Sequence, residues 1–159
     1  MLLVFTSTAL AQSATDEIAA GDRAYAALDE VAALNHYQKA AAAEPKNYEA
    51  LWKASRSAID LGIPAPDAAK RNGLFLTAEQ YGRKAVAVNP GDAEGHFVLA
   101  WALGKTALTQ SASKRVKYGT EVHNHAVECL RLKPSHAGCL HIMCSTLEGF
   151  LSPLHITRL

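Results

Sequence analysis

Histidines and cysteines gather in the C-terminal third of this 159-residue chain, where metal ligands are the chemistry to test first. His136, Cys139, His141 and Cys144 lie close together in sequence, and on a helix His141 and Cys144, three positions apart, could face one ion. Neither a Cys-x-x-Cys nor a His-Glu-x-x-His spacing accompanies them. The sequence therefore predicts no metal and no cofactor, and we interpret the histidines as exposed or hydrogen-bonded.

The three cysteines, Cys129, Cys139 and Cys144, do not indicate a disulfide framework, because their number is odd. Cys129 stands where a repeat helix needs a small buried residue, so we expect it to serve in packing. Cys139 and Cys144 lie five positions apart and would point in different directions on a helix. A bond between those two would require a distorted helix.

Motifs for catalysis are missing from the sequence. It contains no glycine-rich phosphate loop, no Gly-x-Ser-x-Gly and no close pair of carboxylates in a plausible cleft. Lone serines and histidines lack the third group that activates a nucleophile. We therefore expect a protein that is not an enzyme.

Composition and charge exclude several other classes of protein. Apolar residues make up 49% and charged residues 19% of the chain, which is typical of a globular protein, and the net charge is only +1. The short run Lys114, Arg115, Lys117 is the only basic cluster, and a solvated helix face explains it best. No stretch reaches the roughly 20 apolar residues of a membrane span. We expect neither a nucleic-acid partner nor an integral membrane span.

The elements that would position any site are helices arranged in repeats. Three segments share an amphipathic run followed by a proline, and they span residues 36–47, 80–92 and 125–136. A proline stops a helix and forces the preceding residue out of the α conformation. A new amphipathic run follows each stop, at residues 48–62, 93–105 and 137–149. The repeating unit is therefore helix, loop, helix and proline turn.

These repeats resemble the tetratricopeptide repeat. Ala33, Tyr37, Ala40 and Pro45 fit its spacing of small, aromatic, small and proline, and Gly21 matches the small residue of the first helix. The second copy keeps Ala78, Ala85 and Pro90 but has Gly82 for the large residue; the third keeps Leu99, Pro134 and Cys129. The resemblance implies an all-α, right-handed α-solenoid in which small residues let paired helices approach closely.

The repeat domain is predicted over residues 12–149, with repeats at about 14–47, 48–92 and 93–136 and a partial fourth at 137–149. The spacing exceeds the ideal of about 34 residues. We expect the extra residues, around 62–75 and 106–119, in the turns between the two helices of a repeat.

The combination of NPGDAEGHFVLAWALGKTAL with KRVKYGTEVHNHAVECLRLKPSHAGCLHIM is similar to the regulator of microtubule dynamics family and its bacterial, signal-bearing relatives. The similarity runs from about Asp16 to Met143. It implies a scaffold for protein binding, and an interaction with microtubules does not transfer to a secreted chain. The family pattern is lost after Cys144, so we expect residues 150–159 to be an irregular tail and the polar capping helix of a solenoid to be missing.

Residues 1–11 look like the end of a secretory signal, because an apolar stretch precedes the small-x-small site Ala9-Leu10-Ala11. We therefore expect an exported bacterial protein, periplasmic or extracellular. If these residues are not a signal, the chain is cytoplasmic.

In a tetratricopeptide stack, the first helix of each repeat lines the concave face. Carried over position by position, this predicts a partner-binding groove formed by Asp22, Tyr25, Trp52, Arg56, Ile59, Phe97, Trp101 and His141. Aromatic residues and arginine dominate protein interfaces, although either tryptophan could instead be core. We expect the groove to bind a peptide or a partner's helix. The alternative is a structural subunit that associates with itself in an envelope assembly, as a homo-oligomer.

Overall fold

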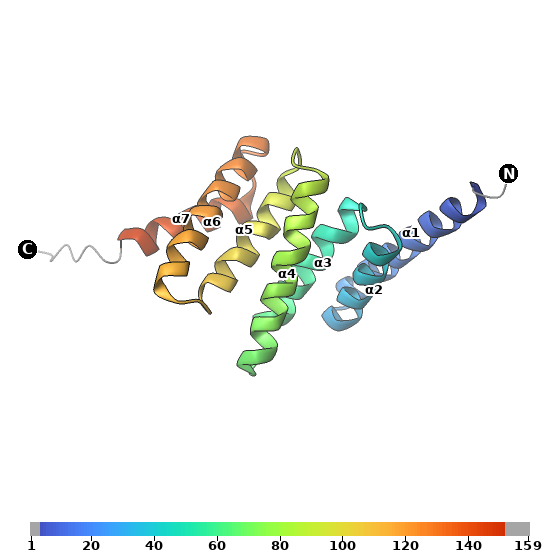
Figure 1. Cartoon of the computed structure of the whole chain (residues 1–159), viewed down its shortest axis with the longest axis horizontal. Coiled ribbons are helices and arrows are strands. Elements are labelled where there is room, and N and C mark those ends of the chain that lie inside the picture. Colours follow the sequence, from blue (N-terminus) through green and yellow to red (C-terminus); the bar gives the residue numbers. More distant parts are fainter. Residues whose placement is uncertain (1–3, 152–159) are drawn as a thin grey trace, which may run out of the picture.

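The computed structural model describes the backbone of residues 4–151 and the side chains of residues 13–145, and this part of the chain is helical throughout apart from short connections. Its helices are α1 (Val4–Ala26), α2 (Glu30–Ala43), α3 (Tyr48–Gly62), α4 (Ala68–Val88), α5 (Ala93–Ala107), α6 (Ala112–Leu132) and α7 (Ala137–Leu151). Figure 1 shows them side by side in chain order, each running opposite to its predecessor. The prediction of an all-α stack of helical hairpins is confirmed.

The prolines end helices as predicted. α2, α4 and α6 finish at Ala43, Val88 and Leu132, and in each case one capping residue separates the last helical residue from the proline. The next helix begins after a short polar turn. Asn47 caps α3 and Asp92 caps α5, each accepting a hydrogen bond from a backbone amide of the first turn.

The extra residues of the second and third repeats do not form long turns, which corrects the expectation from the sequence. α4 and α6 each contain 21 residues, whereas α2 contains 14. Residues 68–75 and 112–119 are helical, so most of each insertion lengthens the second helix of its repeat. The alanines, lysines and arginines in these segments favour helix, and Asp67 supplies a cap for α4.

The helices form two layers. α3 contacts both α1 and α5, and α5 also contacts α7, whereas the described backbones of α2, α4 and α6 do not approach one another within 8 Å. The odd-numbered helices therefore make a continuous inner layer, and the even-numbered helices lie behind them. This arrangement places the first helix of every repeat on one face of the molecule.

Close packing depends on the pairing of small and large residues. A Cβ at Gly21 would lie only 2.5 Å from Cε1 of Tyr37, whose ring is fully buried. At Gly82, a Cβ would lie 3.1 Å from the Cα of Leu99, so here the small residue lets α4 approach the backbone of α5. This contact explains why the second repeat has glycine where the pattern has a large side chain.

Cys129 and Cys139 form a disulfide, which corrects the expectation that Cys129 serves only in packing. The spacing of the cysteines drew attention to Cys139 and Cys144, which share a helix, whereas the bonded pair lies across the turn between α6 and α7. The last turn of α6 and the first turn of α7 meet at the proline turn, and the two Cα atoms lie 6.4 Å apart. Cys144 is free and exposed.

α7 continues to Leu151, so the tail predicted from residue 150 is helical at its first two positions, and residues 152–159 lie outside the described part. Residues 4–11 of the predicted signal form the first turns of α1. Among the described helices, none combines the length and the apolar character that crossing a membrane requires.

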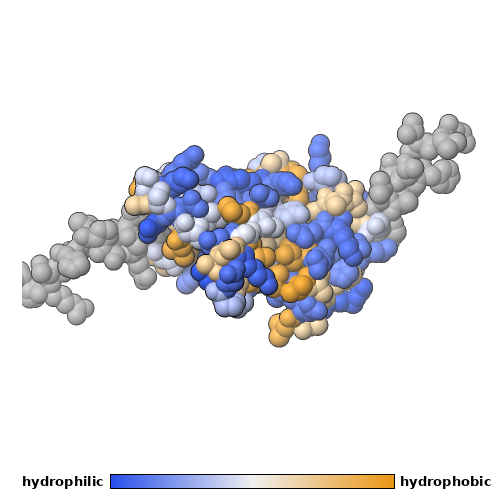
Figure 2. All heavy atoms as spheres, turned by 60° about the horizontal axis from the view of Figure 1, so that its bottom comes forward, coloured by the Kyte–Doolittle hydropathy of each residue, from blue (hydrophilic) through white to orange (hydrophobic). Residues whose placement is uncertain are grey.

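One edge of the stack exposes apolar side chains. The connections within the helical hairpins lie along the lower edge in Figure 1, and the turned view in Figure 2 shows apolar residues there among hydrophilic ones. Leu28 is 84% exposed, Leu108 72% and Val116 67%. Leu28 also has a positive φ of 61°, which is unusual for a residue other than glycine.

Candidate peptide-binding groove

The predicted groove residues all lie on the inner layer, and they form two groups. The first group is on α1 and α3 and contains Asp22, Tyr25, Trp52, Arg56 and Ile59. The second is on α5 and α7 and contains Phe97, Trp101 and His141.

Arg56 is the centre of the first group. Its guanidinium carbon lies 3.9 Å from the centre of the Tyr25 ring and 5.0 Å from the Trp52 ring. All three side chains are half-buried, so neither ring is simply core. A cation held over aromatic faces in a partly desolvated place is stabilised by the ring quadrupoles. The sequence predicted that Trp52 and Arg56 share a helix face, and the structure confirms this.

Tyr25 is held in place from α3. Its hydroxyl donates a hydrogen bond to Oδ2 of Asp60 at 3.2 Å. Burial raises the pKa of Asp60 despite this hydrogen bond and the nearby Arg56. Burial and the charge of Asp60 also raise the pKa of Glu30 at the start of α2. This end of the groove therefore contains two carboxyl groups whose charge is poorly solvated.

Two buried polar atoms at this end of the groove lack a hydrogen-bond partner among the described residues. One is Nε of Arg56, a donor, and the other is Oε2 of Glu30, an acceptor. Leaving such a group unpaired costs about 1–3 kcal/mol.

Asp22 is already paired, so it does not offer a free charge to a partner. Lys53 Nζ donates to both of its carboxylate oxygens, at 2.7 and 2.8 Å, and the Tyr37 hydroxyl donates to Oδ1 at 2.8 Å. Burial alone would raise the pKa of Asp22, but the hydrogen bonds from Lys53 and Tyr37 outweigh it and hold the pKa below its usual value. Asp22 thus joins the buried tyrosine of α2 to α3.

Ile59 does not belong to the groove, which corrects the prediction. Its side chain is fully buried and packs with Ala58, Ala78 and Ala102 in the core between the layers. Position 59 lies three residues after Arg56, but the helix is packed on this side by α4 and α5. The residue therefore stabilises the stack.

The second group is partly assembled. Phe97 and Trp101 stack on one helix face with ring centres 5.5 Å apart. Trp101 and His141 both line a pocket of about 410 Å³ between α5, α6 and α7, together with Lys105 and Arg115. This volume lies within the usual range for ligand pockets.

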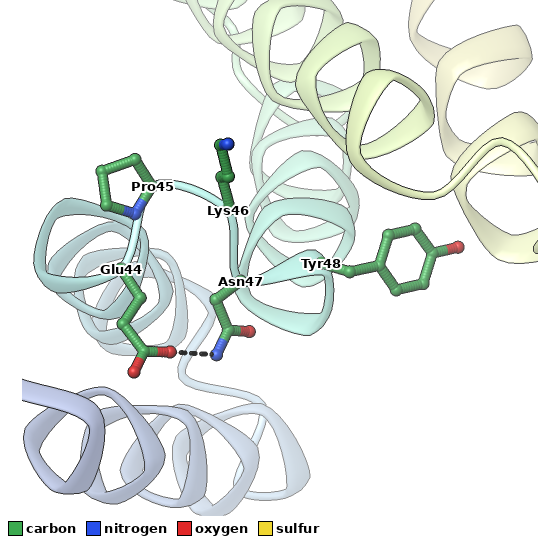
Figure 3. Close-up of a pocket in the computed structure, with 5 residues that line it drawn as sticks. All are labelled: Glu44, Pro45, Lys46, Asn47 and Tyr48. Atoms are coloured by element: carbon green, nitrogen blue, oxygen red, sulfur yellow. Dashed lines mark hydrogen bonds between the residues drawn. The ribbon is translucent and has the colours of Figure 1, made fainter. Parts of the chain in front are cut away.

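A second hollow, shown in Figure 3, follows the turn between α2 and α3. It has a volume of about 650 Å³, but only the five consecutive residues Glu44 to Tyr48 line it. Asn47 Nδ2 donates to Glu44 Oε2 at 2.8 Å across the turn, and Tyr48 points away toward the next repeat. We interpret this hollow as the surface of a well-bonded turn.

Sequence reasoning missed Lys53, Asp60 and Glu30. Lys53 follows Trp52 directly and was therefore not assigned to the same face, yet it is buried and paired with Asp22 and Glu49. Its spacing of four from Glu49 was the available signal. Glu30 begins α2 and Asp60 lies in the last turn of α3, so only the antiparallel packing of these two helices brings them together.

Comparisons with known proteins agree with this geometry. The family model described as regulator of microtubule dynamics protein 1-3 matches residues 17–145. No curated protein sequence matches the chain.

Solved structures of tetratricopeptide repeats are similar in fold. The TPR domain of Arabidopsis OM64 has a TM-score of 0.68 and 14% identity, and the match covers 88% of this chain and 98% of that one. The first TPR of Spaghetti (RPAP3), bound to the HSP90 peptide SRMEEVD, has a TM-score of 0.69 and 16% identity, with 88% and 94% covered. The thermophilic TPR protein TTC0263 of Thermus thermophilus reaches 0.71 and 21%, with 87% and 66% covered.

Proposed function

The chain belongs to the regulator of microtubule dynamics protein 1-3 family, and we propose that it is a non-enzymatic scaffold whose inner layer binds a peptide or a helix of another protein. The observation that carries this proposal is the half-buried cluster of Arg56 with Tyr25 and Trp52. Arginine and tryptophan are the side chains that contribute most often to binding energy at protein interfaces.

The fold gives independent support. Neighbouring inner helices contact each other directly, so their exposed side chains form one continuous surface. A tetratricopeptide domain of similar fold is known with a bound peptide, that of Spaghetti with the HSP90 peptide SRMEEVD. At 16% identity this likeness concerns the fold, and the partner of the present chain is a separate question.

The two groups of residues have different roles in this proposal. Arg56 donates to the main chain or to an acidic group of the partner, and Tyr25 and Trp52 pack against an adjacent side chain. Phe97 and Trp101 on α5 make a second apolar contact further along the layer. Because several anchors then act together, a bound segment must extend across more than one repeat.

A peptide library displayed on phage, selected against the purified chain, tests the proposal directly. We expect selected peptides to bind in solution with dissociation constants in the micromolar range, on the order of those of transient interactions. Replacement of Arg56 by Gln, or of Trp52 by Ala, should weaken binding about tenfold or more while helicity by circular dichroism stays unchanged.

The matched control is Arg131→Gln, which removes an exposed arginine from the outer helix α6. It should bind the selected peptides as the wild-type chain does. Equal loss of affinity in this control and in Arg56→Gln would show nonspecific charge attraction, and unchanged affinity in Arg56→Gln would place the binding surface elsewhere.

Self-association is the second candidate function, and the exposed apolar edge favours it. Leu28, Leu108 and Val116 lie on connections or helix starts along the same edge of the stack. Sedimentation equilibrium over a wide concentration range tests this function. A dimer that Leu28→Ser with Leu108→Ser dissociates, while peptide binding is retained, would establish it.

We also propose that the chain is exported from a bacterial cell. The small-x-small site at residues 9–11 supports this, as does the Cys129–Cys139 disulfide, because disulfides persist in oxidising compartments. The mass of the native protein, recovered from fractionated source cells, should correspond to a chain that begins at Gln12. A chain recovered from the cytoplasm with residues 1–11 intact would contradict export.

A further inference from the structure

The disulfide at the junction of α6 and α7 has a histidine beside it. Cys129 is in the last turn of α6, Cys139 is in the first turn of α7, and His136 lies in the turn between them. The Sγ atoms of Cys129 and Cys139 and one ring nitrogen of His136 all lie within 4.8 Å of one another. The two sulfurs are close because they are bonded, and the buried ring of His136 places a nitrogen beside them, so the three residues form a compact, buried donor set.

The hydrogen bonds of His136 fix which nitrogen has a free electron pair. Nδ1 accepts from the backbone amide of Cys139 at 3.2 Å, so it carries no proton in the neutral ring. Nε2 must therefore hold the proton and donate it to Oε1 of Glu94, also at 3.2 Å. A carboxylate that receives the second ring N–H of a histidine is the arrangement typical of metal-bound imidazoles, because it fixes the tautomer and makes the free nitrogen more basic.

We propose that the reduced chain binds a divalent zinc-type ion through the two sulfurs of Cys129 and Cys139 and through Nδ1 of His136. Glu94 acts as a positioning residue through the other ring nitrogen, and solvent occupies the fourth position. Two sulfurs and one imidazole nitrogen are a donor set that suits zinc and its spectroscopic substitute cobalt. The proposal is independent of peptide binding by the inner layer.

The metal-bound form is reached from the disulfide in two steps, reduction and metal binding. A dithiol or phosphine reductant supplies two electrons to the disulfide, and two protons from water convert the sulfurs to thiols. The ion then displaces both thiol protons, so two thiolates and one divalent cation give a site without net charge. A neutral site suits this buried location, where an uncompensated thiolate would be disfavoured.

Small movements are sufficient to form the site. Tetrahedral zinc with Zn–S bonds of about 2.3 Å places two sulfurs roughly 3.8 Å apart, so the sulfurs must separate once their bond is broken. Nδ1 must give up its hydrogen bond to the Cys139 amide, which belongs to the first turn of α7 and has no acceptor within the helix. Glu94 keeps its hydrogen bond throughout.

Cobalt titration of the full chain, reduced with a phosphine and freed of other metals, tests the site. We expect one equivalent of Co²⁺ to bind, with thiolate-to-cobalt charge-transfer absorption and the visible bands of a tetrahedral ion. Zinc should displace it with the same stoichiometry. Cys144→Ser, which removes the free exposed cysteine, is the matched control and should bind as the wild-type chain does.

Variants assign the roles. Cys129→Ser and Cys139→Ser should lose the charge-transfer band, and His136→Ala should weaken Co²⁺ binding strongly. Glu94→Gln should weaken it about 10–100-fold without changing the number of thiolates bound. Helicity measured with and without metal tests whether each variant folds.

Three results would overturn the site. In the first, the reduced chain is helical but shows no thiolate-to-cobalt charge-transfer absorption when Co²⁺ is added. In the second, the reduced chain stays unfolded when Co²⁺ is added. In the third, His136→Ala binds Co²⁺ as tightly as the wild-type chain does.

Discussion

The hydroxyl of Tyr48 donates to Oδ1 of Asp92, 2.7 Å away and 44 residues later in the chain. Asp92 is the cap of α5, and the same hydroxyl accepts from the backbone amide of Gly95 at 2.8 Å. One side chain from the start of the second repeat thus completes the first turn of the third.

Tyr48→Phe should therefore destabilise the chain, because it removes both hydrogen bonds and leaves the Gly95 amide without this partner. We expect a loss of about 1–3 kcal/mol in the free energy of unfolding, measured by urea titration. Tyr118→Phe is the matched control, since its hydroxyl makes only a long 3.4 Å hydrogen bond to Glu79. A loss as large in the control would contradict the special role of Tyr48.

Two glycine-to-alanine substitutions should have opposite effects. At Gly21, the new methyl group would lie 2.5 Å from the Tyr37 ring, which is fully buried and held by Asp22. We expect a net loss of about 1–3 kcal/mol from overpacking. At Gly104, no neighbouring atom lies within 4 Å of the added carbon, so alanine should stabilise α5 by about 0.5–1 kcal/mol. Thermal unfolding should show a lower melting temperature for Gly21→Ala and a higher one for Gly104→Ala than for the wild-type chain.

Stability should fall in mild acid because of the pair His96 and His125. His96 Nε2 donates to the carbonyl of Pro90 at 3.0 Å, so its Nδ1 accepts the Nδ1–H of His125 at 2.9 Å. Burial, followed by the charges of His96 and Arg83, lowers the pKa of His125. The unfolded chain therefore takes up this proton at higher pH than the folded chain.

The free energy of unfolding should accordingly decrease from about pH 7 downward, by about 1.4 kcal/mol for each unit by which the folded pKa is lowered. His125→Asn should flatten this dependence. His123→Asn, an exposed histidine on the same helix, should leave it unchanged. If the free energy of unfolding depends on pH in the same way in the wild-type chain and in both variants, His125 is not the group responsible.

The disulfide should contribute to stability when no metal is present. Closing a loop of 10 residues restricts the unfolded chain, and we expect reduction in the presence of a chelator to cost about 2–3 kcal/mol in the free energy of unfolding. Cys144→Ser should show the same difference between its oxidised and reduced forms. If reduction has no effect on the wild-type chain, the bond between Cys129 and Cys139 is absent in solution.

Local signals in the sequence were sufficient for the fold. Pro45, Pro90 and Pro134 each follow the capping residue of a helix, and Gly21 meets Tyr37 as the repeat pattern requires. These features act over a few residues or within one hairpin, so spacing alone reveals them.

Contacts between distant segments were not accessible in the same way. Ile59 occupies a groove position in the repeat pattern, yet the approach of α4 and α5 buries it. The Cys129–Cys139 bond depends on how closely two antiparallel helices meet at a turn, and the pairing of Asp22 with Lys53 depends on the register between α1 and α3. The periodicity of a sequence shows which residues share one face of a helix, but it does not show how a neighbouring helix is aligned against that face.

The separation of the outer helices has a mechanical consequence. The described Cα atoms of α2, α4 and α6 do not approach one another within 8 Å, and side chains such as Arg83 and Glu121 bridge the gap between α4 and α6. The stack therefore resembles a fan whose ribs pack closely only along the inner layer. Bending about that line changes the gaps between the ribs and the curvature of the inner surface, while the packing inside each hairpin is preserved. The proposed binding surface can therefore change its curvature to match partners of different width.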